Sequence, residues 1–353
     1  MKAGIFDPYL DILGGGERYT MTVTQYLSQR GWRVDVFWDD KEIKKKLEKR
    51  LGLNFGQIGF VENIFASKKN LPQKWKITRK YDLIFYLSDG SLPLLFAKKN
   101  ILHFQVPFQN VGGRSIFNRV KLRRFNHIVC NSYFTKKYID QEYGVKSRVI
   151  YPPVAVEDFK PGKKENIILA VGRFSKALHA KKQEVLIDGF KQLSEEIKGW
   201  ELVLIGGVRD EDKTYIEELK NKAKGFPIEI LVNVDFATLR KLYSKAKIFW
   251  HAAGFDENER RHPERMEHFG ITVVEAMAAG CVPVVVGKGG IPEIIDDKKS
   301  GFLWKTKKEL RDLTVQLIES PKILKKISVQ SIKASQKFSK KIFCQKINEL
   351  IKN

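Results

Sequence analysis

Short apolar runs alternate with amphipathic stretches along most of the chain, and this alternation constrains the fold more than any other feature. Buried parallel strands read as continuous apolar runs, whereas the stretches between them, such as residues 17–30 before Gly31, have the periodicity of helices. The pattern therefore predicts an α/β protein with parallel sheets. The candidate strands lie at residues 2–6, 33–38, 83–86, 99–104, 127–130, 148–151, 167–171, 201–205, 228–231, 248–251 and 282–286.

The alternation is interrupted at Tyr151-Pro152-Pro153, and the segment from there to Pro161-Gly162 is typical of a linker. Two consecutive prolines prevent a helix and disfavour a central strand. A chain of 353 residues also exceeds what one hydrophobic core usually holds. We therefore expect two Rossmann-like domains, residues 1–153 and 154–334, whose parallel sheets face a central cleft that binds a ligand at the carboxyl ends of the strands.

Composition narrows the class of protein further. Lys and Arg number 64 against 41 Asp and Glu, and the net charge of +23 favours an anionic partner, although widely spread lysines are also typical of solvated helix faces. The three cysteines, Cys130, Cys281 and Cys344, form no CxxC pair, as expected in a reducing compartment. The sequence contains no apolar run of membrane-spanning length and no signal peptide pattern at residues 1–10, so we expect a cytoplasmic protein.

The first candidate motif is Gly14-Gly15-Gly16-Glu17-Arg18, between the first predicted strand and the first predicted helix. Glycines at a helix start let backbone amides approach a phosphate, where the positive end of the helix dipole adds to the attraction. The spacing differs from the GxGxxG pattern, and a flexible turn without a ligand is the alternative interpretation.

The second motif is Gly172-Arg173-Phe174, after the first predicted strand of the second half, followed by Lys181 and Lys182 at a helix start. Arginine offers a bidentate fork and lysine a compact charge, so both suit a diphosphate. A pair of solvated charges at a surface turn is the alternative.

The third motif places Glu267 and Glu275 eight residues apart, with His268-Phe269-Gly270-Ile271-Thr272 between them and a helix rich in small residues after them. Carboxylates near a helix start accept hydrogen bonds from sugar or ribose hydroxyls. A helix-surface acid and a loop charge are the alternative interpretation.

These motifs together resemble the GT4 family of retaining glycosyltransferases. The stretch Glu267–Glu275 resembles the family's E-x7-E motif, and Gly14–Arg18 resembles its GGxER loop. Further similarity lies, in order along nearly the whole chain, at residues 131–136, 149–154, 172–174, 289–295 and 301–303. The resemblance implies a GT-B fold, in which the last helix, here about residues 335–353, crosses back onto the first domain.

The resemblance also implies roles for particular residues. Glu275 would bind the donor ribose, and Glu267 the hydroxyls of the transferred sugar. The backbone of His268, Phe269, Gly270, Ile271 and Thr272 would line the sugar and the diphosphate. Arg173 and Lys181, with Lys182 as the alternative lysine, would hold the diphosphate, with Gly15 and Gly16 on the opposite wall. His103, at a strand end, would face the sugar as a catalytic residue.

Two features depart from the family pattern. The spacing from Arg173 to the lysine is slightly long, which leaves Lys181 and Lys182 both open, with Lys181 favoured. The loop 252–265 is longer and more charged than the usual turn; it would order on donor binding or shape acceptor choice, or else be a solvated surface insertion.

The implied reaction is transfer of a hexosyl group from a UDP-, GDP- or ADP-sugar, with GDP-mannose favoured, to a glycan or lipid-linked glycan. No metal or other cofactor is expected, because cations and helix dipoles neutralise the diphosphate. The basic and apolar segment Arg114–Phe125 suggests peripheral contact with an anionic membrane on its cytosolic face, or else a helix packed on its own sheet. The alternatives are a nucleic-acid-binding protein, motivated by the charge alone, and an epimerase or phosphorylase of the same fold.

Overall fold

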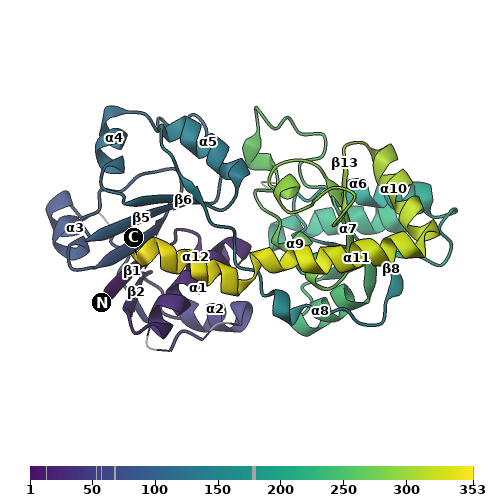
Figure 1. Ribbon diagram of the computed structural model, residues 1–353, viewed down its shortest axis with the longest axis horizontal. Coiled ribbons are helices and arrows are strands. Elements are labelled where there is room, and N and C mark those ends of the chain that lie inside the picture. Colours follow the sequence, from purple (N-terminus) through teal and green to yellow (C-terminus); the bar gives the residue numbers. More distant parts are fainter. Residues whose placement is uncertain (13, 53, 57, 67–68, 177–179, 353) are drawn as a thin grey trace. The chain divides into compact units, whose positions relative to one another are not determined.

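The computed structural model describes the chain except residues 13, 53, 57, 67–68, 177–179 and 353. The chain forms two compact units (Figure 1). One comprises Met1–Pro153 with Lys341–Asn353, and the other comprises Val154–Lys340. Each unit has one fully parallel sheet, which confirms the predicted α/β class.

The first unit contains a seven-stranded sheet in the order β3-β2-β1-β4-β5-β6-β7. Its strands are β1 (Lys2–Phe6), β2 (Arg33–Phe37), β3 (Gly59–Val61), β4 (Leu83–Leu87), β5 (Lys99–Phe104), β6 (His127–Cys130) and β7 (Arg148–Val149). Its helices are α1 (Gly15–Gln29), α2 (Ile43–Leu51), α3 (Leu71–Thr78), α4 (Ile116–Leu122), α5 (Tyr133–Tyr143) and α12 (Lys340–Lys352).

Alternate residues of the central strands of this sheet enter two different cores. On β4, Leu83 and Phe85 pack with apolar residues of α1, α2 and α12, whereas Ile84 and Tyr86 pack with residues of α5 on the other side. Since successive side chains of a strand point to opposite faces, a sheet covered on both faces needs continuous apolar strands. This is why the strands are recognisable in the sequence.

Helix α12 belongs to the first unit although it follows the second along the chain. Phe343, Ile347 and Leu350 are buried in the core of the first unit, and the Phe343 ring meets the Tyr19 ring edge-on, with centroids 4.7 Å apart. The predicted crossing helix begins near residue 335. In the structure, α11 (Pro321–Ser335) ends there, a 3-10 turn follows at Gln336–Phe338, and α12 begins at Lys340.

The second unit contains a six-stranded sheet in the order β10-β9-β8-β11-β12-β13. Its strands are β8 (Glu165–Val171), β9 (Glu201–Gly206), β10 (Ile228–Val232), β11 (Ala246–His251), β12 (Val282–Val286) and β13 (Phe302–Trp304). Its helices are α6 (Gln183–Leu193), α7 (Lys213–Ala223), α8 (Phe236–Lys245), α9 (Ile271–Ala278), α10 (Lys307–Glu319) and α11.

Helices α6, α7 and α10 share one core with the sheet of the second unit. Trp250 of β11 lies in this core and donates a hydrogen bond from its indole nitrogen to Thr314 Oγ1 of α10, 3.1 Å away. On the other face, Phe249 stacks on Tyr243 of α8, and α9 and α11 pack beside each other. The sheet is therefore covered on both faces, and its functional groups are left to the strand ends. None of the described helices is both long and apolar enough to span a bilayer.

We expect replacement of Phe343 by Ala to destabilise the first unit. The side chain is 3% exposed, and removal of a buried aromatic ring costs about 3–5 kcal/mol. Urea unfolding measured by circular dichroism should show the loss. Ile342→Ala is the matched control: its side chain is 38% exposed, so its loss should cost under about 1 kcal/mol. Equal effects of the two changes would show that α12 does not complete this core.

Candidate functional site

Three neighbouring strands of the second unit end in the segments that the sequence singles out. β8 leads into Gly172-Arg173-Phe174, β11 ends at His251, and β12 leads into Gly289-Gly290. Because β8, β11 and β12 are adjacent and parallel, their carboxyl ends lie at one edge of the sheet. This is the edge at which open α/β sheets bind ligands.

The Glu267 carboxylate lies at the centre of the candidate site. Its Oε2 atom accepts hydrogen bonds from Lys181 Nζ at 2.6 Å and from His251 Nε2 at 2.9 Å. The side chains of Lys181, Glu267 and His251 are 21%, 16% and 3% exposed, so the cluster is largely shielded from water. The other carboxylate oxygen, Oε1, has no hydrogen-bond partner among the described residues, which leaves it available to a ligand hydroxyl.

The charge of Glu267 depends on this pairing. Burial acts to raise the pKa of the carboxyl, but the positive charge of Lys181 and the hydrogen bonds from His251 and Lys181 hold the pKa well below its ordinary value. Glu267 is therefore ionised at neutral pH and acts only as an acceptor. The other ring nitrogen of His251, Nδ1, is buried and has no hydrogen-bond partner among the described residues.

Arg173 lies in a turn that is fixed through its backbone. Gln183 of α6 donates from Nε2 to the carbonyl oxygens of Gly172 and Arg173, at 3.2 and 3.0 Å. A Cβ atom at Gly172 would lie 2.7 Å from Cγ of Lys181, so glycine is needed where the lysine stem crosses this turn. The Arg173 side chain is exposed and has no hydrogen bond or ion pair with any described residue. Its guanidinium is therefore free for an anion.

The second candidate lysine, Lys182, has its own carboxylate. Lys182 Nζ lies 2.7 Å from Glu257 Oε1, and both side chains are mostly buried. The hydrogen bond from Lys182 is the main cause of a lowered pKa at Glu257. Glu257 also accepts from Arg265, at 3.2 Å, and its carbonyl oxygen accepts from Lys288. Loop 252–265 is thus joined to α6 and to the segment after β12, not detached as a solvated insertion would be.

The backbone from His268 to Thr272 is held by the glycine pair after β12. The amide of Gly290 donates to Glu267 O at 2.7 Å, and a Cβ at Gly290 would lie 2.3 Å from His268 O. A side chain there would push the Glu267 loop away. Helix α9 then begins at Ile271, where the amides of Val273 and Val274 donate to Gly270 O, whereas those of Ile271 and Thr272 precede the first bond of the helix. The Phe269 side chain is buried against Phe338 and is therefore shielded from a ligand.

Glu275 lies one turn inside α9 and is 9% exposed. The Tyr243 hydroxyl of α8 lies 3.1 Å from Glu275 Oε2 and 3.3 Å from Thr272 O. Burial, together with the Glu275 charge, raises the pKa of Tyr243 well above its ordinary value, so the hydroxyl remains a donor. The Tyr243 contact therefore holds one carboxylate oxygen of Glu275 in place, whereas a carboxylate on an exposed helix surface would be solvated.

The glycine loop of the first unit meets the end of β5. Gln105, directly after that strand, donates from Nε2 to Gly16 O at 3.0 Å. Glu17 Oε2 accepts from the Gly14 amide at 2.5 Å and is 4% exposed. The loop before α1 is thus an anchored turn. Contact of Gly15 and Gly16 with a diphosphate stays a prediction.

His103 is fully buried in the first unit. Its ring stacks on Tyr19 with centroids 4.0 Å apart, and Nδ1 donates to Val129 O at 3.1 Å. Nε2 is buried without a hydrogen-bond partner among the described residues. Burial lowers the pKa of His103 to about 3, against the weaker opposite effect of the Val129 hydrogen bond. In this structure the ring presents no atom to solvent, and its predicted contact with a sugar stays a prediction.

Sequence reasoning missed three residues of the second-unit site: His251, Tyr243 and Glu257. His251 was recognisable as the last residue of a predicted strand, at the sheet edge where ligands bind. Tyr243 and Glu257 carried no such signal, because their partners lie 32 and 75 residues away in the chain. Among the described residues, no group of three or more His, Cys, Asp or Glu side chains is placed to hold a metal ion.

Replacement of Lys181 by Met should leave the Glu267 carboxylate buried with His251 as its remaining partner. We expect a loss of about 2–4 kcal/mol in unfolding free energy at pH 7, most of it recovered in Lys181→Met/Glu267→Gln. The depressed pKa of Glu267 supplies stability above about pH 4.5, which is lost as pH falls through the folded-state pKa. The single variant should therefore approach wild type in acid. A cost independent of pH would show that the pair is not electrostatic.

The buried His103 ring predicts a second dependence of the unfolding free energy on pH, which arises from desolvation of the ring and not from a charge pair. Because its folded-state pKa of about 3 lies below the unfolded value, its contribution to stability is complete above about pH 6.5 and is lost as pH falls. Urea unfolding from pH 7 to 5 should show wild type losing about 2 kcal/mol more than His103→Gln over this range. Asp7, whose burial raises its pKa to about 6, titrates in both proteins and cancels in the difference. Parallel curves would contradict a neutral buried His103.

Comparisons with known proteins cover both units. The family model described as Glycosyltransferase Family 4 matches residues 13–158, and the one described as Glycosyl transferases group 1 matches residues 155–334. A Dictyostelium discoideum GDP-Man:Man(3)GlcNAc(2)-PP-Dol alpha-1,2-mannosyltransferase is 26% identical over 246 residues, which are 64% of this chain and 46% of that protein. The Xenopus laevis protein of the same name is 30% identical over 198 residues, 50% and 38% of the two chains. The chain thus spans less than half the length of these relatives.

Solved structures agree in fold. A Rickettsia africae glycosyltransferase superposes with a TM-score of 0.79 at 19% identity, covering 99% of this chain and 97% of that one. Anabaena Alr3699/HepE in complex with UDP and glucose superposes with a TM-score of 0.74 at 18% identity, covering 100% and 99%. Together with the two family models, which follow each other along the sequence, this shows that the chain belongs to the glycosyl transferases group 1, the GT4 family of glycosyltransferases with a GT-B fold.

Proposed function

We propose that this protein transfers a hexosyl group, with retention, from a nucleotide-diphosphate sugar to a glycan or lipid-linked glycan, and that GDP-mannose is the donor. The observation that carries the proposal is the Glu267 carboxylate, held by Lys181 and His251 with one oxygen unpaired, at the strand edge that also bears Arg173. The curated relatives named as GDP-mannose-dependent mannosyltransferases support the choice of donor.

In this proposal the Lys181–Glu267 pair binds the donor without separating. An ammonium group has three donors and Lys181 uses one on Glu267, so two remain for phosphate oxygens. Glu267 in turn keeps Oε1 for a sugar hydroxyl. Arg173, which has no partner among the described residues, adds a bidentate contact to the diphosphate. Lys182 is the weaker candidate, since binding a phosphate would compete with Glu257.

The remaining contacts with the nucleotide-sugar in this proposal are made by Glu275 and by the backbone at the start of α9. Glu275, whose carboxylate is positioned by the Tyr243 hydroxyl, accepts hydrogen bonds from the ribose hydroxyls. Amide groups from His268 to Thr272 line the sugar and the diphosphate at the positive end of the helix. This arrangement separates acceptors for hydroxyls from donors for phosphate, as a nucleotide-sugar requires.

Catalysis in this proposal comes from stabilising the leaving group. As the glycosidic bond breaks, negative charge grows on the departing diphosphate, and Arg173, Lys181 and the α9 amides stabilise that charge more than they stabilise the bound donor. Removing one such donor raises the barrier by about 2–4 kcal/mol. The acceptor oxygen bonds to the anomeric carbon as the diphosphate leaves, and the departing phosphate takes the acceptor proton. No side chain is assigned as nucleophile.

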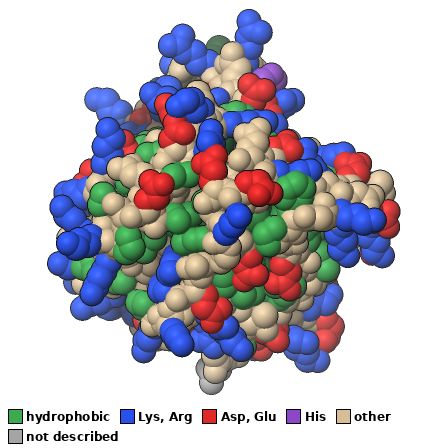
Figure 2. Space-filling model, turned by 90° about the vertical axis from the view of Figure 1, so that its right-hand side faces the viewer, with side chains coloured by type: hydrophobic (Ala, Val, Ile, Leu, Met, Phe, Trp, Pro, Cys, Tyr) green, Lys and Arg blue, Asp and Glu red, His purple; other side chains and the backbone are tan. Residues whose placement is uncertain are grey.

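On one face of the molecule, the charge pattern does not favour nucleic-acid binding. On the face shown in Figure 2, Lys and Arg side chains are interleaved with acidic and apolar ones and form no continuous basic stripe. A nucleic-acid-binding face would gather them along one path. Membership of the glycosyltransferase family also favours group transfer over epimerisation or phosphorolysis.

The acceptor and the location form the last part of the proposal. We place the protein in the cytoplasm, at the cytosolic face of a membrane, where a lipid-linked glycan would be presented. The dolichol-linked names of the curated relatives support an acceptor of this class. The basic and apolar segment from Arg114 to Phe125 supports the location.

Thermal unfolding in the presence of UDP-, GDP- and ADP-sugars should identify the donor. A ligand that binds the folded state at about 100 times its Kd stabilises it by about 2.7 kcal/mol, which raises Tm by several degrees. We expect GDP-mannose to give the largest shift. Glu275→Gln should weaken its binding about 10- to 100-fold through loss of charged hydrogen bonds.

Glu211→Gln is the matched control for this experiment. It makes the same chemical change at a side chain that is 73% exposed, and it should keep the full shift. A panel in which no nucleotide-sugar raises Tm would overturn the proposed function. A larger shift with UDP-glucose would overturn the choice of donor alone.

A further inference from the structure

Helix α4 of the first unit has apolar side chains on its solvent side. Ile116, Phe117 and Val120 are 80%, 81% and 53% exposed, and their spacing of three and four residues places them on one face. Leu122 and Phe125 at the end of this helix pack into the core of the first unit. The helix is therefore already anchored, and its outer apolar side chains have no role in the fold.

The same helix bears cations without carboxylate partners. Arg119, Lys121 and Arg123 make no ion pair with any described residue, and neither does Arg114 just before the helix. The wider segment from Gly90 to Ile139 contains nine Lys and Arg and no Asp or Glu. An apolar face bordered by uncompensated positive charge is the pattern of helices that lie in the interface of an anionic bilayer.

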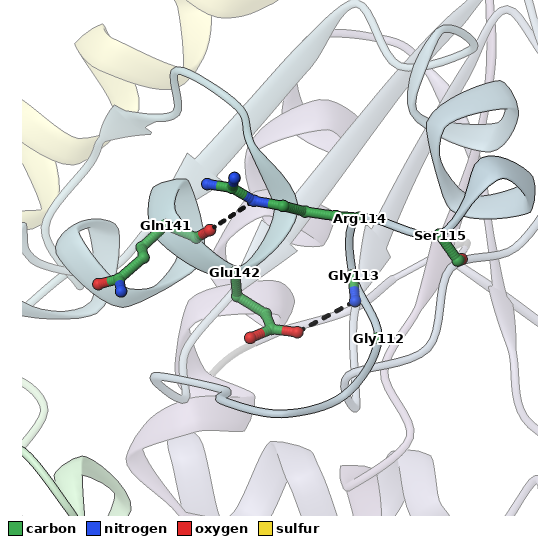
Figure 3. A pocket seen from close by; sticks show the side chains of 6 residues that line it. All are labelled: Gly112, Gly113, Arg114, Ser115, Gln141 and Glu142. Carbon is green, nitrogen blue, oxygen red and sulfur yellow. Dashed lines mark hydrogen bonds between the residues drawn. The ribbon is translucent and has the colours of Figure 1, made fainter.

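A hollow of about 550 Å³ adjoins this helix, lined by Gly112–Ser115, Gln141 and Glu142 (Figure 3). The Glu142 carboxylate accepts hydrogen bonds from the amides of Asn110, Val111 and Gly113 at 3.0–3.1 Å. These three amides stabilise its negative charge. Arg114 donates from Nε to Gln141 O at 3.0 Å, and its terminal nitrogens have no partner among the described residues. The Arg114 guanidinium at the hollow thus has a free edge for an anion, and Ile116 follows two residues later in the chain.

We propose that the α4 surface, formed by Ile116, Phe117 and Val120 with Arg114, Arg119 and Arg123, docks this protein onto an anionic lipid bilayer. The apolar side chains enter the headgroup region, and the guanidinium groups bind lipid phosphates, one of them at the hollow. A protein partner with an acidic groove or a nucleic acid would meet the same cations. Three protruding aliphatic and aromatic side chains side by side favour lipid instead. The inference rests on the proposed function, since it names the surface that a lipid-linked acceptor requires.

Flotation with vesicles of phosphatidylcholine mixed with phosphatidylglycerol tests the docking surface. Wild type should bind at low salt, bind less as salt rises, and bind poorly to phosphatidylcholine alone. Ile116→Ser/Phe117→Ser and, separately, Arg119→Gln/Arg123→Gln should each weaken binding about tenfold or more. Circular dichroism of each variant confirms that it is folded.

Leu71→Ser/Trp75→Ser is the matched control, because these side chains of α3 are 53% and 42% exposed and also lie among basic residues. A loss equal to or greater than that of the Ile116/Phe117 variant would overturn the assignment to α4. Absence of vesicle binding by wild type would also overturn it. So would a result in which the Ile116/Phe117 variant loses binding to single-stranded RNA but keeps binding to vesicles. Donor-induced thermal shifts of the same variants keep this test separate, because they should remain at the wild-type value even if docking fails.

Discussion

The candidate site depends on a single buried negative charge. Glu267 is kept ionised against its own desolvation by two hydrogen-bond donors, the Lys181 ammonium and the His251 ring. Without them, burial would favour the protonated acid, which donates a hydrogen bond instead of accepting several. Both partners bind the same oxygen, so the arrangement stabilises the charge and still leaves an acceptor unused.

The fold holds that charge in place through backbone contacts more than through side chains. The Glu267 carbonyl is bound by the Gly290 amide, and the Lys181 stem crosses the turn at Gly172, where any larger residue would collide. These contacts come from the segments after β12 and β8, two strands separated in the sheet only by β11. Three adjacent parallel strands therefore place the acid, its cation and its histidine together, although they are 86 and 16 residues apart in sequence.

Most strands could be predicted because burial on both faces makes them continuously apolar. The predicted strand at residues 99–104 has the bounds of β5, Lys99–Phe104. β3 and β13 were missed for a physical reason: each is three residues long, at an edge of its sheet, and too short to form an apolar run. In the site, Glu267 and Glu275 were recognisable through the resemblance of their segment to the family's E-x7-E motif. Their partners were not, because ion pairs such as Lys182–Glu257 depend on tertiary contacts that leave no local pattern.

Lys182 shows how the unusual loop 252–265 fits the site. Its backbone has a φ of 55°, a left-handed conformation that a residue with a Cβ adopts at a cost of about 1 kcal/mol or more. Lys182 is the residue directly before α6, and its side chain forms the ion pair with Glu257. Two consecutive lysines consequently bind two different carboxylates, Glu257 and Glu267, ten residues apart on the segment after β11. A shorter loop would have no place for Glu257 and would leave Lys182 strained and unpaired, so the length of the loop and the lysine conformation are best understood as one feature.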